Sequence, residues 1–204
     1  MAFSLVSPKR FAARPALPTT EADIPSRPHV RPIPAPELAD DSVVLRPWAD
    51  DDWPLLVDGW NDREVAAWTS PPDDRTEAAA RRWIAGQDLR RARWLALDLV
   101  IEDRRQGTLV GEIGLSSFST ERTVEIGYWM LASGRGRGLA TASVRLLSDW
   151  VVTTMPSLTV IAEVDVSNTA STSVLRRSGY QTGAATQAGV SRWQRGPNVD
   201  RCDC

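Results

Sequence analysis

The chain has 204 residues, of which 42% are hydrophobic and 25% charged, and its formal net charge is −2. These values fit one globular domain plus a tail, and no apolar run approaches the roughly 18 to 20 residues that span a bilayer. Residues 1–40 carry five basic and four acidic side chains, and the remainder carries 19 and 22. Neither part has the basic excess typical of nucleic-acid binders, so we expect neither a nucleic-acid partner nor a membrane.

The sequence contains one histidine, His29, and two cysteines, Cys202 and Cys204. A Ser-His-Asp triad needs a histidine inside the fold, and a structural zinc site needs three or four clustered Cys or His ligands. Neither can be built here, so no metal is expected. Two cysteines one residue apart give no disulfide framework, which favours a reducing, cytoplasmic location.

Proline and tryptophan divide the chain into segments. Residues 1–40 hold eight of the 14 prolines and no tryptophan, which predicts a disordered N-terminal extension. Its first residues are Arg- and Ala-rich and acid-poor, so a transit peptide is the alternative. All nine tryptophans lie between Trp48 and Trp193. We therefore expect a folded domain at 41–195 and a flexible tail at 196–204.

In chain order, the pattern of apolar residues, caps and turns predicts alternating strands and helices. Acidic residues precede the first two helices, a charged turn joins the two strands of a hairpin, and glycine follows the last helix. The predicted strands are 43–47, 95–102, 109–115, 124–131, 158–166 and a weak one from 180; the predicted helices are 50–60, 73–91, 138–152 and 168–178. The order β-α-α-β-β-β-α-β-α-β predicts a mixed α/β layer architecture.

A glycine-rich loop connects the predicted strand 124–131 to the helix that begins near Gly138. Glycines allow left-handed backbone angles and close approach to an anion, and the free N–H groups of a helix start attract its charge. Arg135 and Arg137 add planar donors suited to phosphate, so the expected ligand is a pyrophosphate. The alternative is a loop that only turns the chain. The stretch lacks the Gly-Lys-Ser/Thr of a P-loop and the G-x-G-x-x-G of dinucleotide-binding folds.

Two motifs together resemble the GNAT (Gcn5-related N-acetyltransferase) superfamily. Arg135-x-x-Gly138-x-Ala140 resembles its pyrophosphate signature, Gln/Arg-x-x-Gly-x-Gly/Ala. The stretch from Asn168 to Tyr180 is similar to the Asn-x-x-Ser-x-x-Val-Leu-x-x-x-Gly-Phe pattern of the ribosomal-protein N-terminal acetyltransferase (RimJ/RimL-type) branch. Leu-Arg-Pro at 45–47 and Val-Gly-Glu-Ile-Gly-Leu at 110–115 also match that branch, so the resemblance covers roughly residues 42–190.

This resemblance implies a GNAT fold of the α/β (α+β) class, with a mixed sheet of about six to seven strands flanked by about four helices. It also implies acetyl-CoA as acyl donor, with the pantetheine arm held where two strands splay apart. The implied cofactor-binding residues are Trp129, Met130, Leu131, Arg135, Gly136, Arg137, Gly138, Leu139, Ala140, Thr141 and Asn168. Homodimers occur in this family, so a homodimer is a further implied arrangement.

The reaction implied is attack of an amine on the thioester. An alkylammonium has a pKa near 10, so a general base must first remove a proton. Glu125 is the first candidate because it opens the cofactor strand, and Glu112 on the neighbouring strand is the second. Ser171 matches a serine that some Rim-type members place near the thiolate. The structural alternatives are paired or solvated carboxylates for Glu125 and Glu112, and helix capping for Ser171 and Asn168.

This sequence departs from the family at two points. The tyrosine acid of many members is replaced by Leu175, and no Asp or Glu occurs from Tyr180 to Val199. The predicted function is N-acetylation of a primary amine, first of all a peptide or protein N-terminal α-amine. The alternatives are a small-molecule amine, as in antibiotic modification, and a non-catalytic acyl-CoA sensor.

Overall fold

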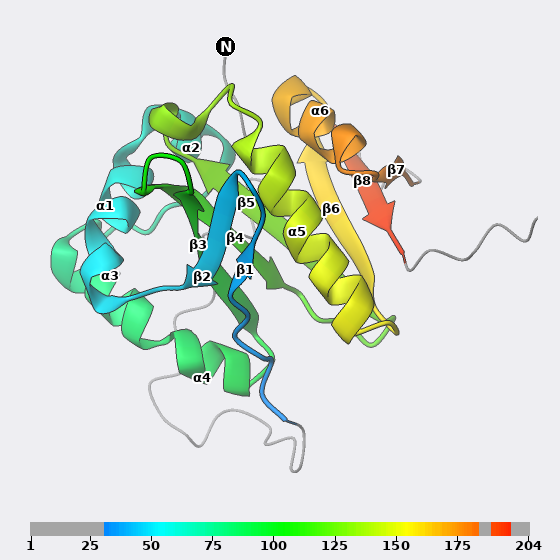
Figure 1. Cartoon of the computed structure of the whole chain (residues 1–204), viewed down its shortest axis with the longest axis horizontal. Helices are drawn as coiled ribbons and strands as arrows, with labels where there is room; N and C mark the ends of the chain where they lie inside the picture. The colour runs from blue at the N-terminus through cyan, green and yellow to red at the C-terminus, as the bar shows by residue number, and fades with distance from the viewer. Residues whose placement is uncertain (1–30, 184–188, 197–204) are drawn as a thin grey trace, which may run out of the picture.

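The computed structural model describes residues 31–183 and 189–196, which form one eight-stranded sheet with helices on both faces (Figure 1). The strands lie side by side in the order β1-β2-β3-β4-β5-β6-β8-β7. All neighbours are antiparallel except β5 and β6. The strands are β1 Leu38–Ala39, β2 Val43–Pro47, β3 Ala96–Asp103, β4 Thr108–Ser116, β5 Thr123–Met130, β6 Thr159–Asp165, β7 Gln181–Thr182 and β8 Val190–Arg195.

Two groups of helices cover the two faces. On one face lie α5 (Leu139–Thr154) and α6 (Thr169–Arg177); on the other lie η2 (Asp50–Asp52), α1 (Trp53–Asn61), α2 (Arg63–Trp68), α3 (Glu77–Ala85) and α4 (Gln87–Ala92). Successive side chains of β5 point to opposite faces of the sheet, so β5 contributes to both apolar clusters. Ile126 and Tyr128 belong to the apolar cluster under α5, whereas Trp129 belongs to the cluster under α1. The α/β class and the predicted order of the main elements are confirmed.

The segment before β3 holds four α-helices where two were predicted: η2 and α1 cover the predicted helix 50–60, α2 was not predicted, and the predicted helix 73–91 is divided into α3 and α4. After α1, Asp62 takes an extended conformation, and its carboxylate accepts the N–H groups of Glu64 and Val65 and so starts α2. The second break falls at Gly86, between α3 and α4. Glycine has a low helix propensity, which explains a break there. Periodicity alone revealed neither α2 nor the break at Gly86.

Residues 31–40, which composition assigned to the extension, lie against the domain. Ile33 is fully buried in the cluster under α5. Its N–H donates to the carbonyl of Arg91, and its carbonyl accepts from the Arg91 guanidinium at 2.9 Å. Leu38 and Ala39 form β1 against β2. The predictions for His29, Cys202 and Cys204 lie outside the described residues.

The parallel pair β5 and β6 positions the site. Their pairing covers only Thr123 to Glu125 on β5 and Thr159 to Ile161 on β6. Beyond that row β5 continues to Met130 beside β4, while β6 continues beside β8. The two strands therefore separate in the middle of the sheet, as the family resemblance implied. The weak strand predicted from Tyr180 is β7, and β8 lies between it and β6.

Candidate active site

The glycine-rich loop is held in left-handed backbone conformations just before α5. Gly136 and Gly138 have φ values of +71° and +81°, and a methyl group added at either would meet nothing within 4 Å. The glycines therefore serve the backbone angles and leave open space beside the loop. Gly138 is the N-cap of α5 and provides no side-chain cap, so the first N–H groups of the helix face that space. Such an N-terminus is suited to a phosphate group.

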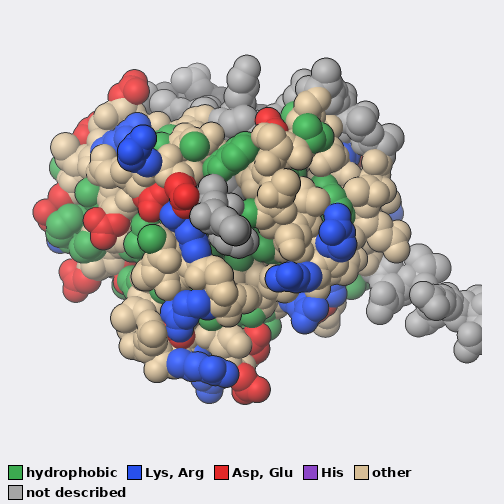
Figure 2. Space-filling model, turned by 90° about the horizontal axis from the view of Figure 1, so that it is seen from above, with side chains coloured by type: hydrophobic (Ala, Val, Ile, Leu, Met, Phe, Trp, Pro, Cys, Tyr) green, Lys and Arg blue, Asp and Glu red, His purple; other side chains and the backbone are tan. Residues whose placement is uncertain are grey.

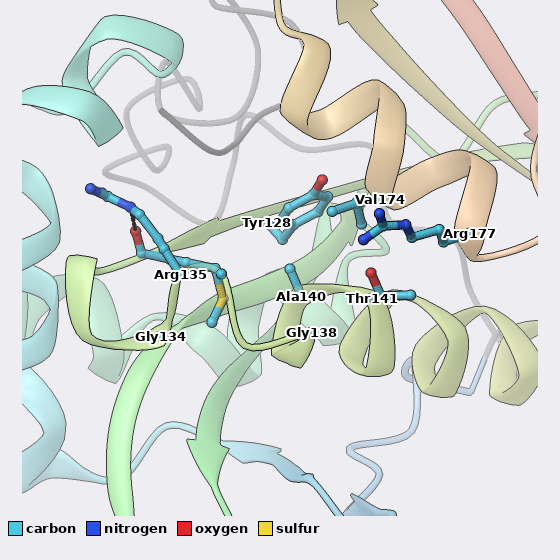
Figure 3. Close-up of a pocket in the computed structure, with 10 residues that line it drawn as sticks. Tyr128, Gly134, Arg135, Gly138, Ala140, Thr141, Val174 and Arg177 are labelled. Atoms are coloured by element: carbon cyan, nitrogen blue, oxygen red, sulfur yellow. Dashed lines mark hydrogen bonds between the residues drawn. The ribbon is translucent and has the colours of Figure 1, made fainter. Parts of the chain in front are cut away.

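A hollow lies between this loop, β5 and α6 (Figure 3). Six of the predicted cofactor residues line it: Met130, Arg135, Gly136, Gly138, Ala140 and Thr141. Four further lining residues were not predicted: Tyr128, Gly134, Val174 and Arg177. Leu139 is buried and anchors the start of α5 in the core. The hollow combines a helix N-terminus, a backbone-lined loop and the region where β5 and β6 separate.

The guanidinium of Arg135 does not face the hollow, contrary to the phosphate contact predicted for it. In Figure 3 the side chain extends away from the pocket centre. Its Nε donates to the carbonyl of Met130 at 2.9 Å, and its two terminal nitrogens pair with Asp62, at 2.9 Å, and with Glu64. Two carboxylates already neutralise this cation, so its side chain is committed to α2.

Arg137 is also engaged by another part of the chain. It pairs with Asp103 at 2.5 Å, at the end of β3, and contacts Gln106 in the following turn. Asp103 is fully buried at that position. Sequence reasoning placed both loop arginines near the phosphate, but none of the three acids could be matched to its arginine without the fold.

Arg177, in the last turn of α6, is the cation that faces the hollow. Figure 3 shows its side chain directed from α6 toward Thr141. Within the described part of the chain its guanidinium has no ion-pair partner. The predicted motif included this position but gave it no role. Its helical spacing from the buried Val174, three residues earlier, is the signal that could have identified it.

The open edge of β5 supplies main-chain groups to the same space. The N–H of Leu131 donates to Val110 on β4. Because successive N–H groups of a strand point to opposite sides, those of Met130 and Tyr128 point away from β4, toward the gap. Of the three strand residues predicted to contact the cofactor (Trp129, Met130 and Leu131), only Met130 has an N–H that points to the gap, and the N–H of Tyr128 points the same way. The indole of Trp129 lies on the other face, where its Nε1 donates to Glu112 at 2.8 Å.

Glu125 and Glu112 lie on the α1 side of the sheet and are both buried. Glu125 is opposite Ser116, and Glu112 is opposite Trp129. The two rows are four residues apart, or about 13 Å of strand, so the two residues occupy separate positions along the sheet. Glu125 lies in the last paired row before β5 and β6 separate. Between the rows Gly114 and Gly127 face each other, and Asp98, opposite Gly114 on β3, is neutralised by Arg90 at 2.7 Å.

Ser171 and Asn168 lie at the start of α6, on the other face. The Asn168 side chain accepts the N–H of Ser171 at 3.0 Å, which confirms its predicted capping role. The hydroxyl of Tyr128 donates to Ser171 Oγ at 3.3 Å. Burial raises the pKa of Tyr128 far above the usual tyrosine value, so this hydroxyl keeps its proton. Tyr128 thus adds a neutral donor at the wall of the hollow.

Comparison with known proteins is consistent with this geometry. The model of the acetyltransferase (GNAT) domain family matches residues 42–181. The chain belongs to the GNAT acetyltransferase family. As a GNAT acetyltransferase it uses acetyl-CoA as acyl donor, and the glycine loop, the uncapped start of α5 and the gap beside β5 fit such a ligand.

Solved structures share the fold of this GNAT domain at low sequence identity. The RimL ribosomal L7/L12 α-N-protein acetyltransferase in complex with coenzyme A is 19% identical, with a TM-score of 0.63, 83% of this chain covered and 100% of that chain. The ribosomal-protein-S5-alanine acetyltransferase from Vibrio fischeri is 14% identical, with a TM-score of 0.67, covering 80% and 97%. The microcin C7 self-immunity acetyltransferase MccE, in complex with acetyl-CoA and AMP, is 17% identical, with a TM-score of 0.65, covering 77% and 93%. No curated protein sequence matches the chain.

Three further findings concern residues 31–183 and 189–196. No helix among them is both long and apolar enough to cross a bilayer. They contain no group of three or more His, Cys, Asp or Glu side chains placed to hold a metal ion. Basic and acidic side chains both occur across the face drawn in Figure 2.

Proposed function

We propose that this GNAT enzyme acetylates the α-amine of a peptide or protein N-terminus, as a RimJ/RimL-like enzyme of the cytoplasm. The observation that carries the proposal is Glu125, a buried carboxylate at the row where β5 and β6 separate. It lies on the sheet face covered by the tryptophan-bearing helices. That face suits an ammonium group attached to a short chain with apolar character.

In the proposed reaction Glu125 accepts a proton from the ammonium, directly or through water, and the amine nitrogen attacks the thioester carbonyl carbon. The new C–N bond forms as the C–S bond breaks, the electron pair of that bond leaves with the sulfur, and the second surplus proton of the nitrogen passes to that sulfur, so the products are the amide and the free thiol. A main-chain N–H on the open edge of β5, at Tyr128 or Met130, supports the negative charge on the carbonyl oxygen.

Tyr128 assists the departing sulfur as a hydrogen-bond donor. Its raised pKa makes full transfer of its proton to a thiolate unfavourable, because thiols are far stronger acids. A neutral donor nevertheless stabilises the developing charge: the phenol O–H turns from Ser171 Oγ to the sulfur, and the Ser171 hydroxyl then donates to the phenol oxygen. This role would replace the tyrosine acid that is missing at Leu175.

For the donor's phosphates, the N–H groups of the loop and of the start of α5 are the principal ligands, with Arg177 as the accompanying cation. Backbone donors at a helix start and one uncommitted arginine suit a pyrophosphate or a terminal phosphate. Arg135 and Arg137 act indirectly, by holding the loop. This division of roles replaces the direct phosphate contacts expected from the sequence.

A small-molecule amine is the second candidate acceptor, favoured by the similarity to the MccE structure. An amine of this kind would also meet the carboxylates and tryptophans of the α1 face. The two candidates differ in what surrounds the amine, because a peptide needs room for a continuing main chain.

The test is release of free thiol from acetyl-CoA with a panel of acceptors. The panel pairs peptides beginning with Ser, Ala and Met with the same peptides blocked at the α-amine but carrying an internal lysine, and adds amine antibiotics. Turnover only with free α-amines supports the proposal. Turnover only with antibiotics would show that the acceptor is a small-molecule amine. Tight acetyl-CoA binding without any product would favour an acyl-CoA sensor.

Glu125→Gln is the decisive variant in this assay, and Glu121→Gln is its matched control. Glu121 is exposed in the loop before β5, so its substitution leaves the site intact. Loss of turnover in the first variant alone supports Glu125 as the base. Equal turnover in both variants would exclude that role.

A further inference from the structure

One side chain connects the cofactor loop to the helices of the opposite face. Arg135 leaves the loop, donates to the carbonyl of Met130 at the end of β5, and then pairs with Asp62 and Glu64 at the start of α2. The partners lie 73 and 71 residues before it in the chain. The Arg135 side chain is only 12% exposed. A shielded guanidinium bound by two carboxylates makes a stronger link than an exposed pair.

Asp62 has two functions at this junction. Its carboxylate accepts the N–H groups of Glu64 and Val65, which starts α2, and the same Oδ1 accepts from Arg135. Any shift of the Arg135 guanidinium therefore acts on the first turn of α2. Trp60 of α1 and Val65 of α2 belong to the same apolar cluster as Trp129 of β5. Helix α2 therefore borders the sheet face that bears Glu125.

Arg137 belongs to the same loop as Arg135 but makes a different kind of contact. It pairs with Asp103, at the β3–β4 turn. That contact joins the loop to the sheet and makes no connection with α1 or α2. The loop is thus held at two points, and only one of them reaches the acceptor side.

We propose that Arg135 is a positioning residue that transmits acetyl-CoA binding from the glycine loop to α2 through Asp62 and Glu64. A pyrophosphate on the loop N–H groups fixes the backbone at Arg135. The fixed guanidinium then holds the start of α2, which orders the side of the acceptor site that α1 and α2 cover. Donor binding consequently prepares the acceptor site, whichever amine that site accepts.

Hydrogen–deuterium exchange of the full chain, with and without coenzyme A, measures this link without an acceptor. In the wild type, saturating coenzyme A slows exchange of the α2 amides (Arg63–Trp68) by about tenfold, within the range typical of coupled sites. In Asp62→Asn/Glu64→Gln the slowing falls below about twofold. Asparagine caps a helix as well as aspartate does, so the variant removes the ion pair and keeps the cap.

Two comparisons make the result specific. Asp103→Asn breaks the other arginine pair, and in it the effect of coenzyme A on α2 persists. Arg135→Gln, which keeps every residue of α2 and the capping Asp62, loses the effect as the double variant does. By reciprocity, calorimetry shows coenzyme A binding to the double variant weakened by the factor lost in α2 protection.

Unchanged protection of α2 in both variants of the ion pair would overturn the proposal. Faster α2 exchange on adding coenzyme A would also overturn it, since it would mean that Arg135 leaves the acids for the phosphate. A wild type that binds no coenzyme A would remove both this proposal and the assignment of the loop. Failure to find an acceptor would concern only the proposed function, because every measurement here uses coenzyme A alone.

Discussion

The two faces of the sheet differ in chemistry although they share the same strands. Under α5 and α6 the buried side chains of the strands are aliphatic or aromatic, apart from Asp103, which lies opposite Val43 of that cluster and is paired with Arg137. The other polar groups there include the hydroxyls of Tyr128, Ser148 and Ser171. Under α1 to α4 the strands bury the carboxylates of Asp98, Glu112 and Glu125 beside tryptophans. Burying carboxylates is costly unless they are compensated, so their concentration on one face indicates where charge is used.

Because successive strand residues face opposite layers, one face of the sheet can provide stability while the other provides the reacting groups. Glu125 and Ile126 are adjacent in sequence but face opposite layers. The face under α5 supplies the apolar packing that holds the loop and the gap in position. On the α1 face carboxylates occupy buried positions where apolar side chains would pack, and these carboxylates can accept and release protons. The predictions below test this separation, from the largest expected effect to the smallest.

Glu125→Gln should lower kcat by roughly 10³-fold, or about 4 kcal/mol, because a positioned general base contributes about 10² to 10⁴. The amide keeps the shape of the side chain, so the free energy of unfolding should change little. Steady-state kinetics with the acceptor found in the panel, together with a denaturant titration, checks both. A destabilised protein with normal kcat would contradict the proposed separation.

Ile126→Ala should have the reverse profile. Ile126 is fully buried in the cluster under α5, and removing such a side chain costs about 3 kcal/mol through lost burial and the cavity left behind. The folded fraction should keep kcat within about threefold of the wild type. Urea unfolding measures the loss of stability, and active-site titration corrects kcat for the folded fraction. A large drop in kcat at full occupancy would show that the two faces are not independent.

Tyr128→Phe should affect both properties moderately, because Tyr128 packs on the α5 face but lines the hollow. Loss of its hydrogen bond to Ser171 should cost about 1 kcal/mol of unfolding free energy. Loss of the donor for the leaving sulfur should lower kcat by about tenfold without changing the KM for acetyl-CoA. Ser171→Ala serves as the control, since it removes the acceptor and keeps the phenol. An unaffected kcat in Tyr128→Phe would remove Tyr128 from the reaction.

The smallest expected effect concerns the pH dependence of stability. Burial raises the pKa of Asp62, but the N–H of Val65 and the Arg135 guanidinium more than compensate, so the pKa lies below its ordinary value of 3.8. A carboxyl group with a lowered folded-state pKa stabilises the protein above its unfolded pKa, and this contribution is lost as the pH falls through the folded value. Asp62→Asn should therefore flatten the loss of stability between about pH 5 and 2. Identical acid-unfolding profiles for variant and wild type would contradict the assigned ion pair.

Local patterns predicted what depends on neighbours in sequence. The glycines at 136 and 138, the start of α5 and the cap at Asn168 follow from turn and cap chemistry, and the structure has each of them. The directions of Arg135 and Arg137 could not be predicted in this way. Their partners lie 73 and 34 positions earlier, and several acids compete for any arginine until the fold selects one.

Tyr128 was missed for a related reason. It occupies an inward position in an apolar strand, where packing is the default explanation. Its hydroxyl gains significance only because the pairing of β5 with β6 ends three residues earlier, at Glu125, and leaves a space beside Tyr128. The ten residues before the predicted domain start were missed because proline content predicts disorder, whereas the fully buried Ile33 shows one side chain fixing that segment.

The early end of the β5–β6 pairing has a consequence for the lifetime of the protein. It leaves a strand edge inside the sheet, with main-chain donors and acceptors that no neighbouring strand satisfies there. Exposed edges of this kind are templates for pairing with another polypeptide, and proteins usually cover them. In the proposed arrangement the donor arm lies along β5 and would cover this edge, so that acetyl-CoA would protect the strand as well as react. The resistance of the enzyme to aggregation should then follow the supply of its own acyl donor.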